Sequence, residues 1–228
     1  MTLASTRSKA SRAAMAPIAF ALLLSAATVT AHAHQVWIER SAPSGPAQIH
    51  YGDVDGERPR GEALRKLQAT TRVFGTDPQE TFQVELKQDQ VEARVDGPGD
   101  VRMINDGIWK PFKNKEGLMH AVIFNSRAGR AETTAALDLE LVPVQAHGNT
   151  VALRFKGKPV AGSSITVINP ALWRKTFLTD EQGRITIPDV GKGRYVLLGS
   201  YEFEGEAQVG PEKVQSVKYV TSLTFIAD

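Results

Sequence analysis

Short runs of alternating apolar and polar residues cover most of the chain after residue 34. Val36 and Ile38 share one face of the first run, and Phe82, Val84 and Leu86 share one face of a later run. Period-two alternation bounded by Gly, Pro, Asp and Asn is typical of β-strands. In the first half it predicts strands over residues 35–39, 47–51, 81–95, 101–104, 118–124 and 137–142.

The pattern becomes more regular after Pro143, where we place a domain boundary. Strands are predicted over residues 150–155, 160–167, 185–187, 194–198 and 217–225, separated by short turns. The one helix candidate is the short segment 61–69, where Leu64 and Leu67 are three residues apart. We therefore predict an all-β protein with two antiparallel β-sandwich domains, residues 34–143 and 144–228.

The first 33 residues have a different pattern, typical of a secretory signal peptide. Arg7, Lys9 and Arg12 precede an apolar run over residues 13–29, and small residues follow. The run is shorter than the about 20 residues that a membrane-spanning helix needs, and no similar run occurs later. We predict cleavage after Ala33, or alternatively after Ala31, a periplasmic location, and no membrane span in the mature chain.

Charge and cysteine content narrow the possible functions. The chain has 27 basic and 25 acidic residues; removing residues 1–33 leaves 24 basic residues, so the mature chain is nearly neutral. A balanced charge gives no indication of a nucleic acid partner. Because the chain has no cysteine, its core has to stabilise it without disulfides.

Two segments of the second domain carry a family resemblance. GKPVAGSSITVINP and TDEQGRITIPDVGKGRYVLL, residues 157–170 and 179–198, resemble the small sandwich of carboxypeptidase-regulatory and transthyretin-like domains. Asp180 is expected to hydrogen-bond within its own turn, and Gly183 to take a positive φ. This resemblance implies a fold and leaves the function open.

The chain from His34 to Phe225 resembles a narrower family. AHQVWIE, IHYGDVDGE, LDLELVP, TDEQGR and KYVTSLTF occur in the order found in exported bacterial proteins of a domain-of-unknown-function family. Members are described as periplasmic components associated with nickel or cobalt ABC transport. The resemblance implies a divalent metal ligand at His34 and an inner-membrane metal transporter as partner. Many members carry further histidines in the last hairpin, where this chain has Tyr201 and Tyr219.

The residues around His34 agree with metal binding. Cleavage after Ala33 would give His34 a free α-amine beside its ring, and amine and imidazole nitrogens suit Ni(II), Co(II) and Cu(II). His50 is the favoured second ligand, because it approaches the amino terminus if its strand pairs with the first. His120 is a further candidate, although its alternation with Val122 and Phe124 also fits a core position.

Other polar residues have simpler interpretations. His147 is expected in a solvated loop. Asp53, Asp55 and Glu57 surround a glycine as in a calcium loop, but the further ligands of that motif are missing, so a polar turn is favoured.

Two other functional classes stay open. The chain lacks the common hydrolase, metalloprotease and phosphate-loop motifs, so we expect no such enzyme. A copper enzyme could use His34 as an amino-terminal histidine brace together with His50 or His120. A metal-free envelope interaction module could use Trp37, Trp109 or Trp173, although burial is the commoner role of a tryptophan.

Overall fold

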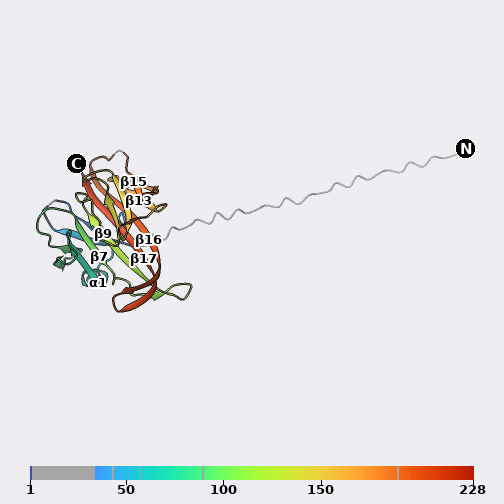
Figure 1. The fold of residues 1–228 in the computed structure, drawn as a ribbon, viewed down its shortest axis with the longest axis horizontal. Coiled ribbons are helices and arrows are strands. Elements are labelled where there is room, and N and C mark those ends of the chain that lie inside the picture. Colours follow the sequence, from blue (N-terminus) through green and yellow to red (C-terminus); the bar gives the residue numbers. More distant parts are fainter. Residues whose placement is uncertain (2–33, 43, 57, 89, 189) are drawn as a thin grey trace. The chain divides into compact units, whose positions relative to one another are not determined.

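The computed structural model in Figure 1 describes Met1 and residues 34–228, except residues 43, 57, 89 and 189. The predicted signal peptide, apart from Met1, and Glu57 of the polar turn lie outside the described residues. Strands dominate the described chain, and one short helix accompanies them. The predicted all-β sandwich class is confirmed.

The strands of the described residues form three sheets. The amino-terminal sheet has the order β1 (Gln35–Glu39), β2 (Ala47–Gly52), β6 (Val91–Ala93) and β5 (Val84–Leu86). The carboxy-terminal sheet contains β10 (Leu139–Pro143), β11 (Thr150–Phe155), β12 (Lys158–Pro159) and β15 (Arg184–Thr186). The nine-stranded central sheet has the order β14 (Arg174–Leu178), β13 (Ser164–Ile168), β16 (Gly193–Val209), β17 (Glu212–Ala227), β9 (Met119–Ala128), β7 (Val101–Asn105), β3 (Thr71–Phe74) and β4 (Thr81–Phe82), with β8 (Phe112–Lys113) beside β9.

The central sheet is covered on both faces. Because successive strand residues point to opposite faces, Val122 and Phe124 pack with Ile38 and other residues of the amino-terminal sheet. Ala121 and Val217 instead pack with the apolar residues of β10 and β11. The result is two sandwiches that share the central sheet. Helix α1 (Glu62–Thr70), predicted over 61–69, adds Leu64 and Leu67 to the first core.

The central sheet joins distant parts of the sequence. Its strands are paired antiparallel except at β17 and β9, which run parallel with Val217 opposite Ala121. Strands from both sides of the expected boundary at Pro143 therefore lie in one sheet (Figure 1). The division into domains 34–143 and 144–228 stays a prediction.

Most predicted strands occur close to their expected positions, and the differences are local. The segment 81–95 is not one strand, because β4 joins the central sheet while β5 and β6 join the amino-terminal sheet. The hairpin of β16 and β17 is much longer than predicted. Four strands were missed: β3, β8, β12, which lies where a turn was expected, and β14. The Asp180 turn forms as expected, with Asp180 Oδ1 accepting from the backbone N of Gln182 and Arg184 at 2.9 and 2.8 Å and with Gly183 at φ 73°.

Candidate functional site

Strand β1, which begins one residue after His34, is fastened to the central sheet. As the edge strand of its own sheet, it has backbone groups that no neighbouring strand satisfies on one side. Hydroxyl groups take that place: the Ile38 N–H donates to Ser126 Oγ at 3.0 Å, and Thr224 Oγ1 donates to the Ile38 carbonyl at 2.6 Å. These contacts are buried, so they attach β1 to the central sheet at Ile38.

His34 lies exposed at the beginning of this strand. Its Nδ1 is 3.4 Å from the Tyr51 hydroxyl, and the two rings meet edge-on with centroids 5.2 Å apart. The register of β1 and β2 pairs Gln35 with Gly52, and continuing it by one residue sets His34 opposite Asp53. An imidazole, a phenol and a carboxylate therefore belong to neighbouring positions at this end of the sheet.

The first two strands do pair, which was the condition for His50 to approach the amino terminus, but His50 points away from His34. His50 is paired with Trp37, whereas the ring of His34 contacts Tyr51, the next residue of β2. Adjacent strand residues project to opposite faces. The two histidines therefore occupy different faces of the amino-terminal sheet.

His50 is also engaged in contacts of its own. Its ring lies 5.1 Å from that of Trp37, and its Nδ1 is 3.1 Å from Arg58 Nη1. A guanidinium can only donate, so Nδ1 of His50 accepts this bond. Coordination of a metal through Nδ1 would require Arg58 to move away.

His120 lies buried near the beginning of β9. It shares a face with Val122 and Phe124, as its alternation predicted, and its Nδ1 is 2.8 Å from Ser216 Oγ and 3.5 Å from Glu202 Oε1. The His120 ring also lies 5.3 Å from the ring of Phe112, whereas the His34 ring contacts Tyr51. Among the contacts of the described residues, the two histidines have no partner in common.

The other polar candidates have structural partners. His147 is exposed in a loop, as predicted, and its backbone N–H donates to the Arg130 carbonyl at 2.7 Å. Asp55 forms a two-point ion pair with Arg174, at 3.1 and 2.5 Å. Within the described ranges, no three His, Asp or Glu side chains are grouped closely enough to hold a metal ion. A preformed site of side chains alone is therefore not present there.

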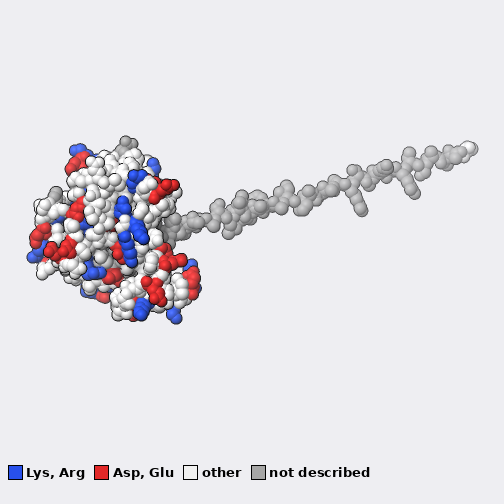
Figure 2. Space-filling view, viewed as in Figure 1, with Lys and Arg blue, Asp and Glu red and all other residues white. Residues whose placement is uncertain are grey.

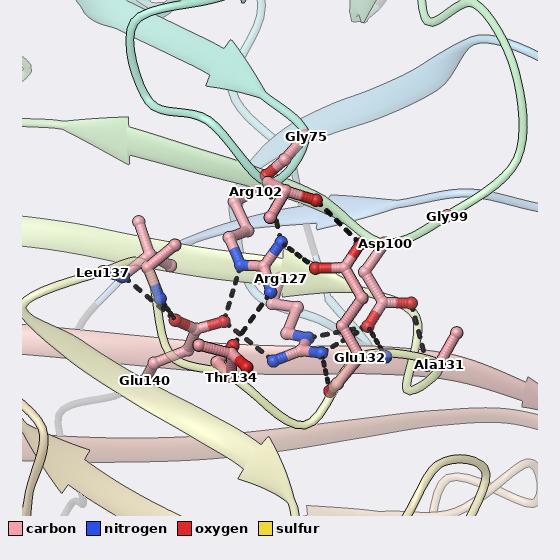
Figure 3. Close-up of polar contacts among 12 residues, drawn as sticks. Gly75, Gly99, Asp100, Arg102, Arg127, Ala131, Glu132, Thr134, Leu137 and Glu140 are labelled. Carbon is pink, nitrogen blue, oxygen red and sulfur yellow. Dashed lines mark hydrogen bonds and ion pairs between the residues drawn. The ribbon is translucent and has the colours of Figure 1, made fainter.

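The strongest polar cluster of the protein was missed by the sequence reasoning. Figure 3 shows Arg102 and Arg127, neighbours on β7 and β9, surrounded by Asp100, Glu132 and Glu140. Both arginines and Glu140 are 0% exposed. Glu140 Oε1 accepts from Arg102 Nε at 2.8 Å and from Arg127 Nη1 at 2.9 Å. We call these five residues the buried ion cluster.

The remaining atoms of the buried ion cluster are satisfied too. Asp100 accepts from the backbone N of Ala131 and Glu132 at 2.9 and 3.0 Å and pairs with Arg127. Burial lowers the pKa of Arg102, but the Glu140 and Glu132 carboxylates outweigh it and raise that pKa above its ordinary value. Because its donors and acceptors bind one another or the backbone, the cluster connects strands and offers little to a ligand.

The visible face of the molecule carries a mixed charge. On the face shown in Figure 2, basic and acidic side chains are interspersed among uncharged ones. In the part of the chain that the structure describes, no helix is both long and apolar enough to cross a membrane.

Comparisons with known proteins add no further constraint. Neither a protein-family model nor a curated protein sequence matches this chain. The functional argument therefore rests on the residues around His34.

Proposed function

We propose that the protein binds a divalent transition metal ion, Ni(II), Co(II) or Cu(II), at an amino terminus created by export. One observation carries the proposal: His34 is an exposed imidazole directly ahead of β1, whose backbone is fastened to the central sheet. Cleavage after Ala33 would add a free α-amine to the same residue. An amine and an imidazole on one residue form a nitrogen chelate suited to these metals.

Further ligands would come from the end of the amino-terminal sheet. The arrangement favours Tyr51 and Asp53, because the first lies beside the His34 ring and the second follows Gly52, the partner of Gln35. His50 and His120, the ligands expected from the sequence, would both have to leave their present contacts. Their participation stays a prediction.

The open position of His34 suits capture and delivery. Ligands at an exposed strand end can be replaced by those of another protein, so an ion held there would exchange readily. We propose a periplasmic role accessory to metal uptake or homeostasis, with an inner-membrane metal ABC transporter as the receiving partner. The ligands have to be deprotonated to coordinate, so affinity is expected to fall as pH drops through the range in which histidine is protonated.

The proposal is tested by calorimetry on the processed protein, after mass spectrometry has established that it begins at His34. Ni(II) and Cu(II) are titrated into the mature chain, a chain with one alanine added before His34, and His34→Ala. Both changes are expected to lower affinity by at least about tenfold. His147→Ala is the matched control, because His147 is an exposed histidine in a distant loop. Equal affinity in the extended chain would exclude the amino-terminal site.

The same experiment separates the other two classes. Copper binding accompanied by ascorbate-dependent oxidation of a substrate would favour the copper enzyme. Indifference to all three metals, together with a captured envelope protein, would favour the interaction module.

A further inference from the structure

Exposed apolar side chains are concentrated around β14, an edge strand of the central sheet. Trp173 is 78% exposed, Leu178 69% and Leu172 48%. The sequence-based expectation that tryptophans are buried is confirmed for Trp37 and wrong for Trp173. Single exposed apolar residues are common, but three within seven positions of one edge indicate an interaction surface.

The loop before β14 holds these side chains in a defined conformation. Asn169 Oδ1 accepts from the backbone N of Ala171 and Trp173 at 3.1 and 2.9 Å, and the Leu172 N–H donates to the Asn169 carbonyl at 2.9 Å. Leu172 has a φ of 63°, a conformation that is strained for a bulky residue. Strain that is maintained by surrounding contacts is a feature of functional surfaces.

The backbone of β14 faces outward at alternate residues. The Trp173 carbonyl accepts from the Asn169 N–H at 3.1 Å, and the Thr179 N–H donates to the Ser163 carbonyl at 2.9 Å. In an antiparallel pair, residues bonded to one neighbour alternate with residues directed away from it. Arg174, Thr176 and Leu178 therefore direct their N–H and C=O groups to the open edge, where β14 ends the described strand order.

We propose that this edge pairs with the β14 edge of a second copy of the chain, antiparallel and with the two-fold axis through Thr176. The register is then fixed: Thr176 lies opposite Thr176, Lys175 opposite Phe177, and Arg174 opposite Leu178. Such an interface is isologous, because the same strand serves both copies. It joins the two central sheets into one continuous sheet.

The charge pattern of β14 favours this partner and this direction. The two cations, Arg174 and Lys175, precede the two apolar residues, Phe177 and Leu178. An antiparallel two-fold therefore places each cation opposite an apolar residue, whereas a parallel pair would oppose like charges, which destabilises a sheet. Within one chain, Lys175 Nζ already lies 5.2 Å from the centroid of the Phe177 ring, and the second copy repeats this combination.

The size of the edge makes the dimer a weak one. A five-residue strand with a few flanking apolar side chains buries less area than the about 800 Å² per partner of a standard interface. The proposal is independent of metal binding, because no residue of β14 belongs to the site around His34.

Sedimentation equilibrium over about 5 to 500 µM, a range that suits a small interface, tests the association. The mature protein is expected to change from one to two chain masses as its concentration rises. Thr176→Pro removes the central outward N–H without breaking a backbone hydrogen bond to β13, so it should fold and remain monomeric. It loses the 3.4 Å contact between the Thr176 and Thr166 hydroxyls, as Thr176→Val also does. Thr176→Val keeps that N–H and is the control that should still dimerise. A wild-type chain that stays monomeric, or a Thr176→Pro variant that dimerises equally, overturns the proposal.

Cross-linking tests the register even if the proline variant does not fold. The chain has no native cysteine, so Thr176→Cys and Leu178→Cys each introduce a single thiol. Across the proposed axis the two 176 Cα atoms are about 5.5 Å apart, within disulfide range, whereas the two 178 positions are separated by several residues. With diamide as the oxidant, a disulfide dimer is expected for Thr176→Cys alone. Preferential cross-linking at 178 would refute this register.

Discussion

Replacing Glu140 by glutamine is the sharpest test of what holds the layers together. The side chain is fully buried and accepts four hydrogen bonds. One oxygen binds the two guanidiniums, and the other binds the backbone N of Ala136 and Leu137 at 2.6 and 3.0 Å. Glutamine has the same shape, but an NH2 group, which donates, replaces one of the two carboxylate oxygens. Either the arginines or the backbone amides of the 136–137 loop would then face an N–H group.

The expected cost follows from this arrangement. Glu140→Gln removes the carboxylate shared by two buried cations and leaves two donors unpaired. Breaking a buried ion pair by changing one partner costs about 3–5 kcal/mol. Small domains have a free energy of unfolding of about 5–15 kcal/mol, so a large part of the stability depends on this one group.

Urea unfolding followed by tryptophan fluorescence measures the effect. The midpoint of Glu140→Gln should fall strongly at an unchanged slope. Glu62→Gln is the matched control, because Glu62 forms an exposed ion pair with Arg65 at 2.7 Å and should change stability by at most about 0.5 kcal/mol. If both variants lose similar amounts, the buried ion cluster does not stabilise the fold in the way argued.

Two further outcomes follow from buried polar groups on β17. Burial, with a contribution from the Asp138 carboxylate, raises the pKa of Tyr219 to about 12. The folded chain therefore holds this proton to higher pH than the unfolded chain does. The stabilisation should be complete below about pH 10 and be lost as pH rises toward 12. Urea unfolding at several pH values measures this decline, which Tyr219→Phe should remove. Thr224→Val should cost about 1–3 kcal/mol in thermal unfolding, because it leaves the buried Ile38 carbonyl without its donor. Thr221→Val, in the same strand, should be nearly neutral, since its hydroxyl bonds to no described protein atom.

Local patterns were sufficient for the fold class and for the first two strands. Alternation in the first two strands predicted both β1 and β2, and their pairing follows with His50 opposite Trp37. The same alternation explains why His50 turns away from His34. The sequence also indicated the core position of His120, because Val122 and Phe124 follow it at intervals of two residues.

The missed strand β14 has a pattern that solvent exposure explains. In β14 the sequence Arg-Lys-Thr-Phe-Leu shows no alternation, because both faces of this edge strand are largely exposed. The parallel pairing of β17 with β9 joins segments about a hundred residues apart, so no local pattern could indicate it. The ion pair of Asp55 with Arg174 likewise joins segments more than a hundred residues apart and was equally hidden.

The buried ion cluster was hidden for a different reason, and that reason also indicates its role. Arg102 and Arg127 occupy the polar positions of strands in which apolar and polar residues alternate. Such positions face solvent when only one side of a sheet is covered. Here a third layer covers that side, and β10 supplies Glu140 between them. A slip of β10 by one residue would turn Glu140 to the other face and leave both guanidiniums without their shared carboxylate. We infer that the cluster fixes the register of β10 with β11 and its position against the central sheet, because other registers leave buried charges unpaired.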